Sequence, residues 1–419
     1  MAAYFRTVRN FPISVHLYNW TSFNLGFAFF GLYTVLYNLF LLRVGFNQEL
    51  IGQVNGVGQL SWALLALPAS LASRRFGLRN VLVVGSLLVS LGLGVLPLVE
   101  RVPLQVRIAW LFASTFILWT GAALVSVNNL PLLTYITHPE ERSHALAVSG
   151  SSIALASVVG SLVAGLLPGW IASLGGTTLE QAAPYGLALW LAPVFFLINA
   201  FLFARISTNG PLVSEPETKK AAPPPIVLFL FIGIVIFLQT ASEGGVRAFF
   251  NIYLDKDLGV STAQIGALFG AAGVLPILSA LLMPLLVGRF GSGAAFCLAG
   301  LGGAVFLILL GAVPHPLAAA LGFIGFNMIA NLAASVRSLL SQEIVEPRWR
   351  SVSSAILILG LALGWASMAF LGSLLIGQAG FSGLMYVSAA SGLLSITLMF
   401  AYLRLNPTHQ VATPLVHEA

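Results

Sequence analysis

Long apolar stretches, separated by short polar segments, run along almost the whole chain. A helix needs roughly 20 mostly apolar residues to cross a hydrocarbon core about 30 Å thick. The stretches are continuous, whereas a barrel strand would alternate over about ten residues. We therefore predict an all-α integral membrane protein. Its twelve spans are expected at residues 14–42, 50–73, 80–99, 107–135, 144–171, 184–205, 225–253, 263–288, 293–313, 317–343, 351–378 and 382–404.

One polar, proline-rich segment at residues 207–225 interrupts this pattern between the sixth and seventh spans. Such a composition is typical of a linker that does not pack. The predicted organisation is therefore a six-helix bundle at 1–206, a cytoplasmic linker at 207–225 and a second six-helix bundle at 226–419. At a finer scale, Ser261 and Gln264 form a capping-box pattern ahead of the eighth span.

The composition agrees with a lipid environment and gives the chain an orientation. Only 8% of the residues are charged, against about 25% in an average soluble protein. If both termini are cytoplasmic, thirteen basic residues fall on the inner side and four on the outer side, as the positive-inside rule requires. This bias explains the net charge of +6 without a nucleic-acid partner. We expect a multi-pass protein of the cytoplasmic membrane with cytoplasmic termini.

The two predicted bundles resemble each other in sequence. Ile51-Gly52 followed by Arg75-Phe76-Gly77 has the same spacing as Ile265-Gly266 followed by Arg289-Phe290-Gly291. Asn38 and Asn251 each precede a short apolar triplet and then a glycine, and Pro139 with Arg142-Ser143 corresponds to Pro347 with Arg350-Ser351. Three matches in the same order indicate a duplication. Parallel six-span repeats place a binding site near the midplane between the halves.

The segment Arg75-Phe76-Gly77-Leu78-Arg79 resembles the end of the loop motif of the major facilitator superfamily. The resemblance implies a secondary transporter. The loop residues it marks are Arg75, Gly77, Arg79, Arg289 and Gly291. The chain also departs from the family pattern, because Arg74 and Gly288 stand where an aspartate is usual, and the arginine and Gly-Pro signatures of many proton-coupled antiporters are not matched.

Span seven carries the most informative polar positions, which recur at every fourth residue: Gln239, Glu243, Arg247 and Asn251. Such spacing places them on one face of a helix. A charge inside a membrane helix usually has a functional role, here in handling substrate or protons. The alternative is a structural pair of Glu243 with Arg247. The adjacent Gly244 and Gly245 fit either a hinge or loose packing.

Polar and aromatic side chains also lie on three other spans. The candidates for lining a central cavity are Tyr33, Thr34, Tyr37 and Asn38 on span one, Trp119 and Asn129 on span four, and Asn327 and Asn331 on span ten. For any single one of them, hydrogen bonding between helices is the alternative. Arg337 on span ten could extend to Glu343 as an anchor, or could form a gate or contact an anionic substrate.

These residues favour alternating-access transport of a small, weakly charged, amphipathic or hydrophobic solute; efflux is compatible with this interpretation, and the sequence does not decide between import and export. A neutral sugar or other polar solute is the alternative substrate, and a non-transporting assembly factor or receptor is the alternative class. Because no phosphate-binding loop occurs, ATP is not the expected driver. We expect no enzyme activity, cofactor or metal, a monomer, and H+ or Na+ as the coupling ion if there is one.

Overall fold

The computed structural model describes residues 11–138, 141–207, 225–346 and 349–405, and within these ranges every regular element is helical. Most of the predicted linker at 207–225 lies outside the described residues, as do Pro139 and Pro347 of the repeat. The same holds for the basic residues of the N-terminal end and of the linker that entered the charge count.

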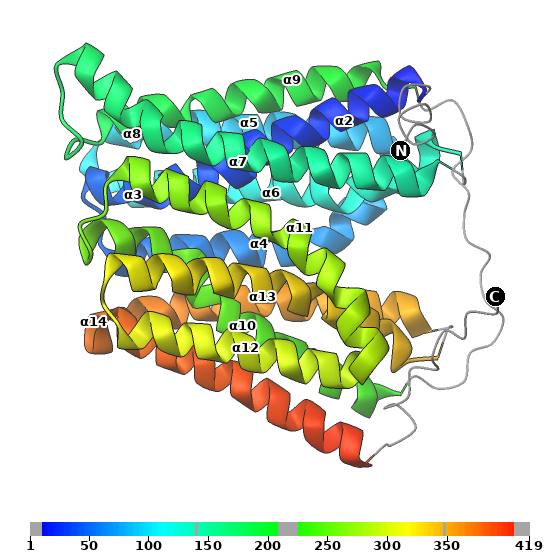
Figure 1. Cartoon of the computed structure of the whole chain (residues 1–419). Coiled ribbons are helices and arrows are strands. Elements are labelled where there is room, and N and C mark those ends of the chain that lie inside the picture. Colours follow the sequence, from blue (N-terminus) through cyan, green and yellow to red (C-terminus); the bar gives the residue numbers. More distant parts are fainter. Residues whose placement is uncertain (1–10, 139–140, 208–224, 347–348, 406–419) are drawn as a thin grey trace. The chain divides into compact units, whose positions relative to one another are not determined.

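The first half of the chain forms the helices that precede the linker (Figure 1). An α-helix, a π-helix and a second α-helix follow each other without a break: α2 (Ile13–Leu25), η1 (Gly26–Tyr33) and α3 (Thr34–Val44). The remaining elements are α4 (Gln48–Phe76), α5 (Leu78–Val95), the 3-10 helix η2 (Leu96–Arg101), α6 (Leu104–Ile136), α7 (Arg142–Gly175), α8 (Ala183–Leu189) and α9 (Leu191–Arg205).

The second half contains five helices by the same description: α10 (Ile226–Lys256), α11 (Thr262–Phe290), α12 (Ser292–Ala312), α13 (Pro316–Glu343) and α14 (Arg350–Leu405). The eleventh and twelfth predicted spans both fall within α14, whose backbone leaves the helical region at Gly380 (φ 66°, ψ −173°). Counting that helix once, ten helices in the described ranges are long and apolar enough to cross a membrane, and Thr262–Val274 is a shorter apolar segment.

The chain divides into two compact units. Unit 1 comprises Met1–Asn47, Val57–Ser214 and Gly259–Gly273, and unit 2 comprises Gln48–Gly56, Glu215–Leu258 and Val274–Ala419. The first turns of α4 therefore belong to unit 2, and the first half of α11 belongs to unit 1. Dividing the sequence at its linker would instead assign all of α4 to the first unit and all of α11 to the second.

The backbone carries the duplication that the sequence motifs predict. Among the described residues, positive φ angles occur only at glycines, which form three pairs in corresponding loops: Gly45 and Gly259, Gly77 and Gly291, and Gly176 and Gly380. Gly77 (φ 82°, ψ 147°) and Gly291 (φ 79°, ψ 161°) have nearly the same backbone conformation. Residues with a Cβ atom rarely adopt such a positive φ angle, whereas glycine does so readily. The helices α4 and α11 that precede them contain 29 residues each.

The capping box ahead of α11 is confirmed. The backbone N–H of Ser261 donates to the Oε1 atom of Gln264 at 3.1 Å, and the backbone N–H of Gln264 donates to the Oγ atom of Ser261 at 3.4 Å. These reciprocal bonds satisfy two donors at a helix end that has no partners within its own backbone. The local sequence therefore determines where α11 begins.

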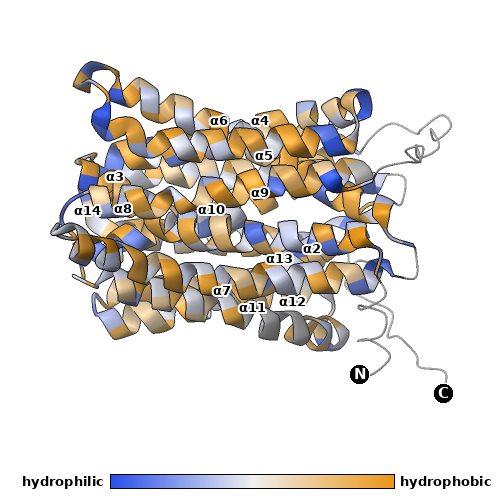
Figure 2. Cartoon of the chain, turned by 90° about the horizontal axis from the view of Figure 1, so that it is seen from above, coloured by the Kyte–Doolittle hydropathy of each residue, from blue (hydrophilic) through white to orange (hydrophobic). Residues whose placement is uncertain are grey.

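The helix faces turned away from each unit's interior are apolar. Among the large hydrophobic side chains that are more than 60% exposed are Leu64, Leu166, Val227, Leu285 and Val305. Figure 2 shows hydrophobic colour along most of the helix lengths, with hydrophilic colour concentrated towards the helix ends and loops. Water would not solvate such faces well, whereas lipid chains do.

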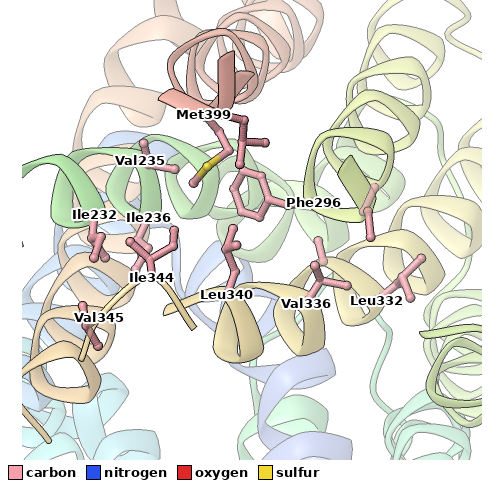
Figure 3. Close-up of a cluster of buried hydrophobic side chains, with 14 residues drawn as sticks. Ile232, Val235, Ile236, Phe296, Leu332, Val336, Leu340, Ile344, Val345 and Met399 are labelled. Carbon is pink, nitrogen blue, oxygen red and sulfur yellow. The ribbon is translucent and has the colours of Figure 1, made fainter. Parts of the chain in front are cut away.

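An apolar core forms between α10, α12, α13 and α14 of unit 2. Figure 3 shows its main side chains, including Ile232, Ile236, Phe296, Val336 and Met399, which come from all four helices. Burial of such a cluster fixes α13 against α10. Because Val336 and Leu340 belong to this core, the position of Arg337 on the same helix is fixed as well.

Close packing of α10 on α14 depends on glycines. A Cβ atom at Gly364 would lie 2.1 Å from the Oγ1 atom of Thr240, and one at Gly244 would lie 2.8 Å from the Cβ atom of Met368. The Thr240 hydroxyl donates to the Gly360 carbonyl across this contact at 3.1 Å. Gly244 is therefore neither loosely packed nor a free hinge, because it lies at a close helix crossing. A Cβ atom at Gly245 would likewise meet the Ser388 Oγ atom at 2.8 Å.

We expect Gly364→Ala to destabilise unit 2 by about 1–3 kcal/mol, because the added methyl group would overlap Thr240 and the Phe237 carbonyl. Gly377→Ala is the matched control on the same helix, since nothing lies within 4 Å of the site where its Cβ atom would be. The apparent melting temperature in detergent should fall for the first variant and stay constant or rise slightly for the second. Equal melting temperatures would contradict close packing at Gly364.

Candidate functional site: an Arg-Glu-Arg cluster in unit 2

A carboxylate on α10 lies at the centre of a polar cluster. Glu243 is 4% exposed, and the Nη1 atom of Arg337 on α13 donates to its Oε1 atom at 3.1 Å. Its Oε2 atom lies 3.7 Å from the Nε atom of Arg247 and accepts a hydrogen bond from the indole N–H of Trp365 on α14 at 3.4 Å. Three helices therefore supply partners to one carboxylate.

The Arg337 side chain is almost completely buried, with 4% of its surface exposed. Its Nη1 atom also donates to the Oε1 atom of Gln239 at 3.1 Å, so two of the four polar residues predicted on α10 bind the same guanidinium group. The predicted anchoring of Arg337 to Glu343 is wrong. Glu343 instead accepts a short hydrogen bond from Ser292 at the start of α12, because the apolar core directs Arg337 towards α10.

Arg247 differs from Arg337 in its surroundings. Its side chain is 54% exposed, and its guanidinium carbon lies 4.4 Å from the centroid of the Trp365 ring. A cation over an indole face is stabilised electrostatically. The predicted structural pair of Glu243 with Arg247 does exist, but at 3.7 Å it is a longer contact than the one with Arg337. Trp365 was not a candidate from the sequence, since nothing in the local pattern of α14 connects it to α10.

The cluster holds two guanidinium groups for one carboxylate. An isolated charge costs several kcal/mol when it is removed from water, and a partner offsets that cost only when the hydrogen bonds are well formed. Here one cation and the carboxylate neutralise each other, and the second cation is compensated only by the Trp365 ring and a 3.7 Å contact. The cluster is therefore polar, rigid on the Arg337 side and positively charged on the Arg247 side.

Unit 1 contains an aromatic group at the positions predicted on spans one and four. Tyr33 stacks on Phe29 with ring centroids 5.0 Å apart and lies 4.6 Å from the Tyr37 ring. Phe29 meets the Trp119 ring edge-to-face at 5.6 Å, and the Tyr37 hydroxyl is hydrogen-bonded to Thr115 at 3.1 Å. These contacts bring α6 and the first span together through their aromatic faces.

The Tyr33 hydroxyl and the Trp119 indole N–H are buried, and neither makes a hydrogen bond of ordinary geometry, although the two side chains interact with each other. A buried donor without a partner costs about 1–3 kcal/mol, so such atoms are uncommon unless a ligand or water uses them. Tyr33 ends the π-helix η1, and π-helical turns occur frequently at functional sites. Thr34 follows the same geometry, since its hydroxyl donates to the Phe29 carbonyl five residues earlier at 3.0 Å.

The other predicted amides differ in their surroundings, and the buried Oδ1 atom of Asn129 has no hydrogen-bond partner among the described residues. Asn38 and Asn251 are both buried, at 5% and 2% exposure, as expected of equivalent positions in a duplication. Asn327 and Asn331 are partly buried and donate to carbonyls four residues earlier on α13. Asn129 is partly buried, whereas its neighbour Asn128 is 1% exposed and donates to the Ala69 carbonyl of α4 at 3.2 Å. The sequence analysis missed Asn128 as the residue that links these helices.

The loop residues do not belong to either group. Arg75, Arg79 and Arg289 are exposed at helix ends. The guanidinium carbons of Arg75 and Arg289 lie over the rings of Phe76 and Phe290 at 5.4 and 5.3 Å. Together with the matching conformations of Gly77 and Gly291, these contacts make the two loops structural equivalents.

The chain belongs to the Major Facilitator Superfamily, because the sequence model of that family matches residues 20–233 and again residues 232–418. Members of this family are membrane transporters, and the two matches agree with the repeated backbone. The protein is thus a multi-pass membrane transporter by family, with a small molecule as its cargo. No curated protein sequence matches the chain significantly.

Solved structures agree on the fold. The xylose transporter XylE from E. coli in an inward-open conformation is 14% identical with a TM-score of 0.72, covering 93% of this chain and 95% of that one. The nucleoside transporter NupG is 14% identical with a TM-score of 0.70, covering 94% and 100%. A peptide transporter in complex with sulfate is 15% identical with a TM-score of 0.71, covering 95% of both chains.

Neutralising the three charges of the cluster should affect stability unequally. Glu243→Gln leaves two cations without an anion, and we expect a loss of about 3–5 kcal/mol, as for a broken buried ion pair. Arg247→Gln leaves the Arg337 contact intact and should change stability by less than about 1 kcal/mol, because that side chain is half exposed.

Chemical or thermal denaturation in detergent would measure this order, with Glu49→Gln as the control at an exposed acidic position. A larger loss for Arg247→Gln than for Glu243→Gln would show that Glu243 depends on Arg247 more than on Arg337.

Proposed function

We propose that this protein is a secondary transporter that moves a small organic solute across the cytoplasmic membrane by alternating access. The observation that carries the proposal is the cluster of Glu243, Arg337 and Arg247 within membrane-spanning helices of a chain from a transporter family. Charges in such helices are costly and are usually found where a substrate or ion passes. The proposal treats residues 1–206 and 226–419 as the two bundles and 207–225 as the cytoplasmic linker.

The proposed topology has twelve spans with both termini in the cytoplasm. A helix of 56 residues would be about 80 Å long at 1.5 Å per residue, which is more than twice the hydrocarbon thickness of about 30 Å. The backbone break at Gly380 supports two spans within α14, and the 29 residues of α11 are enough for one. The excess of basic residues in the inner loops supports the orientation.

The proposed translocation site uses Gln239, Glu243, Arg247, Arg337 and Trp365 in unit 2. A separate candidate in unit 1 is the buried aromatic group of Tyr33, Tyr37 and Trp119. Aromatic faces bind apolar parts of a solute, and the hydroxyl and indole N–H groups beside them bind an acceptor atom. This combination suits an amphipathic organic solute, for which export and import are both compatible. A neutral sugar is the alternative substrate, since aromatic rings with amides also suit sugar rings.

Glu243 is the proposed coupling residue. It is the carboxylate of the cluster, and a proton on it would release Arg337 and Arg247 from their shared anion. In this scheme H+ is the coupling ion, whereas a sodium gradient or facilitated diffusion would not require a titratable Glu243.

Alternating access predicts that a position on a helix that carries the proposed site reacts from each side of the membrane in turn. In a Cys297→Ser background, Asn327→Cys on α13 should react with a membrane-impermeant thiol reagent applied to either face of sealed vesicles. Val305→Cys on α12 is the control, since Val305 is 63% exposed on an apolar face and a thiol in lipid stays unreactive.

Labelling of Asn327→Cys from one side only, under imposed proton gradients of both directions, would favour a non-transporting assembly factor or receptor on the same scaffold.

Proton coupling gives a second expectation. A solute found by screening proteoliposomes under imposed proton and sodium gradients should no longer accumulate against its gradient when Glu243→Gln replaces the wild type. Exchange of labelled for unlabelled solute should persist, because that reaction needs no net proton movement. Full proton-driven accumulation by Glu243→Gln would exclude Glu243 as the proton carrier.

A further inference from the structure

The charge of the cluster in unit 2 is not balanced by the side chains that form it. Two guanidinium groups lie within 4 Å of one carboxylate, and the remaining partners, Gln239 and Trp365, are neutral. The side chains of the cluster therefore sum to one net positive charge. An uncompensated charge within a membrane helix is unfavourable, so a ligand with one negative charge would be stabilised there.

Arg247 is the group that offers unused donors. Its Nε atom lies 3.7 Å from Glu243, which exceeds the usual hydrogen-bond distance, and half of its side chain is exposed. A guanidinium group has five N–H donors in a planar fork that matches a carboxylate bidentately. The Trp365 ring lies 4.4 Å beneath this fork and restricts its orientation. The side chain is thus held in place with its donors available.

Arg337 supplies a second, independent observation. Its Nε atom is buried and has no hydrogen-bond partner, although its Nη1 atom bonds both Gln239 and Glu243. The carboxylate of Glu243 therefore satisfies only part of the donor capacity of the two arginines. Acceptor atoms are in short supply at this site, and any ligand that fits it must bring acceptors.

We propose that the transported solute is a singly charged organic carboxylate, whose carboxylate group binds Arg247 beside Glu243 and whose apolar body lies against Trp365. The inference rests on the proposed transport function and specifies its substrate class. A carboxylate supplies one negative charge and makes the loaded cluster neutral. A phosphate monoester carries about 1.5 to 2 negative charges at neutral pH and would leave an excess.

In this arrangement Glu243 acts as the internal competitor of the substrate. Without substrate, Glu243 pairs with both Arg247 and Arg337. When the substrate carboxylate binds Arg247, Glu243 stays paired with the buried Arg337. Arg247 is then the residue that selects for charge, and Arg337 is a positioning residue that holds Glu243 in place. The expectation from the sequence of a weakly charged amphipathic solute is retained in part, since the body of the solute remains apolar.

A paired ligand panel tests the proposal. The purified full-length protein in detergent would be screened by thermal shift against aliphatic and aromatic monocarboxylates, from acetate to octanoate and benzoate, each matched with its neutral amide. A ligand that binds only the folded state raises the melting temperature. We expect stabilisation by members of the carboxylate set and not by the matching amides.

Three variants separate charge recognition from general stability. Arg247→Gln should lower the apparent affinity for the stabilising carboxylate by about tenfold or more, since a hydrogen bond to a charged group is worth about 1.5–3 kcal/mol. Arg247→Lys should recover part of it, because lysine keeps the charge without the fork. Arg404→Gln is the control and should bind normally, as Arg404 lies 4.5 Å from the Phe400 ring centroid in a similar contact elsewhere on α14.

Equal stabilisation by carboxylates and amides, unchanged carboxylate affinity in Arg247→Gln, or no stabilisation by any carboxylate would each overturn the assignment. Its failure can be distinguished from failure of the transport function. If Asn327→Cys reacts from both sides while no carboxylate binds, the protein transports by alternating access and the substrate class is wrong. If labelling is one-sided while carboxylates bind at Arg247, the site is a receptor for anions.

Discussion

Lipid cannot solvate a charge, so an ionised group buried among these helices needs a partner, and Glu243 has its shortest ion pair with a residue of another helix. The contact of Glu243 with Arg337, at 3.1 Å between α10 and α13, is the interaction on which the account depends. It makes a buried carboxylate tolerable and leaves a second arginine, Arg247, largely exposed. The apolar core around Val336 and Leu340 holds Arg337 at that depth, so ordinary hydrophobic packing determines the electrostatics of the site.

Close packing of backbone determines the rest of the geometry. Gly244 and Gly364 allow α10 and α14 to approach closely, and Trp365, next to Gly364, thereby reaches both Glu243 and Arg247. Interfaces of small residues are a common way to bring membrane helices together. In unit 1 the first span contains the π-helix η1. Tyr33 at the end of η1 stacks on Phe29, whose ring meets Trp119 of α6. The corresponding helices of the two halves therefore carry different side chains: an aromatic group in unit 1 and a charged cluster in unit 2.

The sequence predicts the repeating parts of this fold well and the specific contacts poorly. Apolar run length and the Arg-Phe-Gly loops are local signals, and they lead to the helices, the capping box at Ser261 and the paired glycines. Arg337 and Glu243 are 94 residues apart and Trp365 is 122 residues from Glu243, so helical spacing could not pair them. The nearby Glu343 was a wrong choice of partner, because distance along one helix says nothing about the neighbouring helix.

The most direct test is to exchange the charges of the central pair. Glu243→Arg and Arg337→Glu would each place like charges together, and each variant alone should fold poorly and lose most of its yield as monodisperse protein in detergent. Combining the two restores an opposite pair between the same helices, and the account predicts that yield and melting temperature recover substantially towards the wild type. A double variant no more stable than the single variants would contradict a central role for the contact between Glu243 and Arg337.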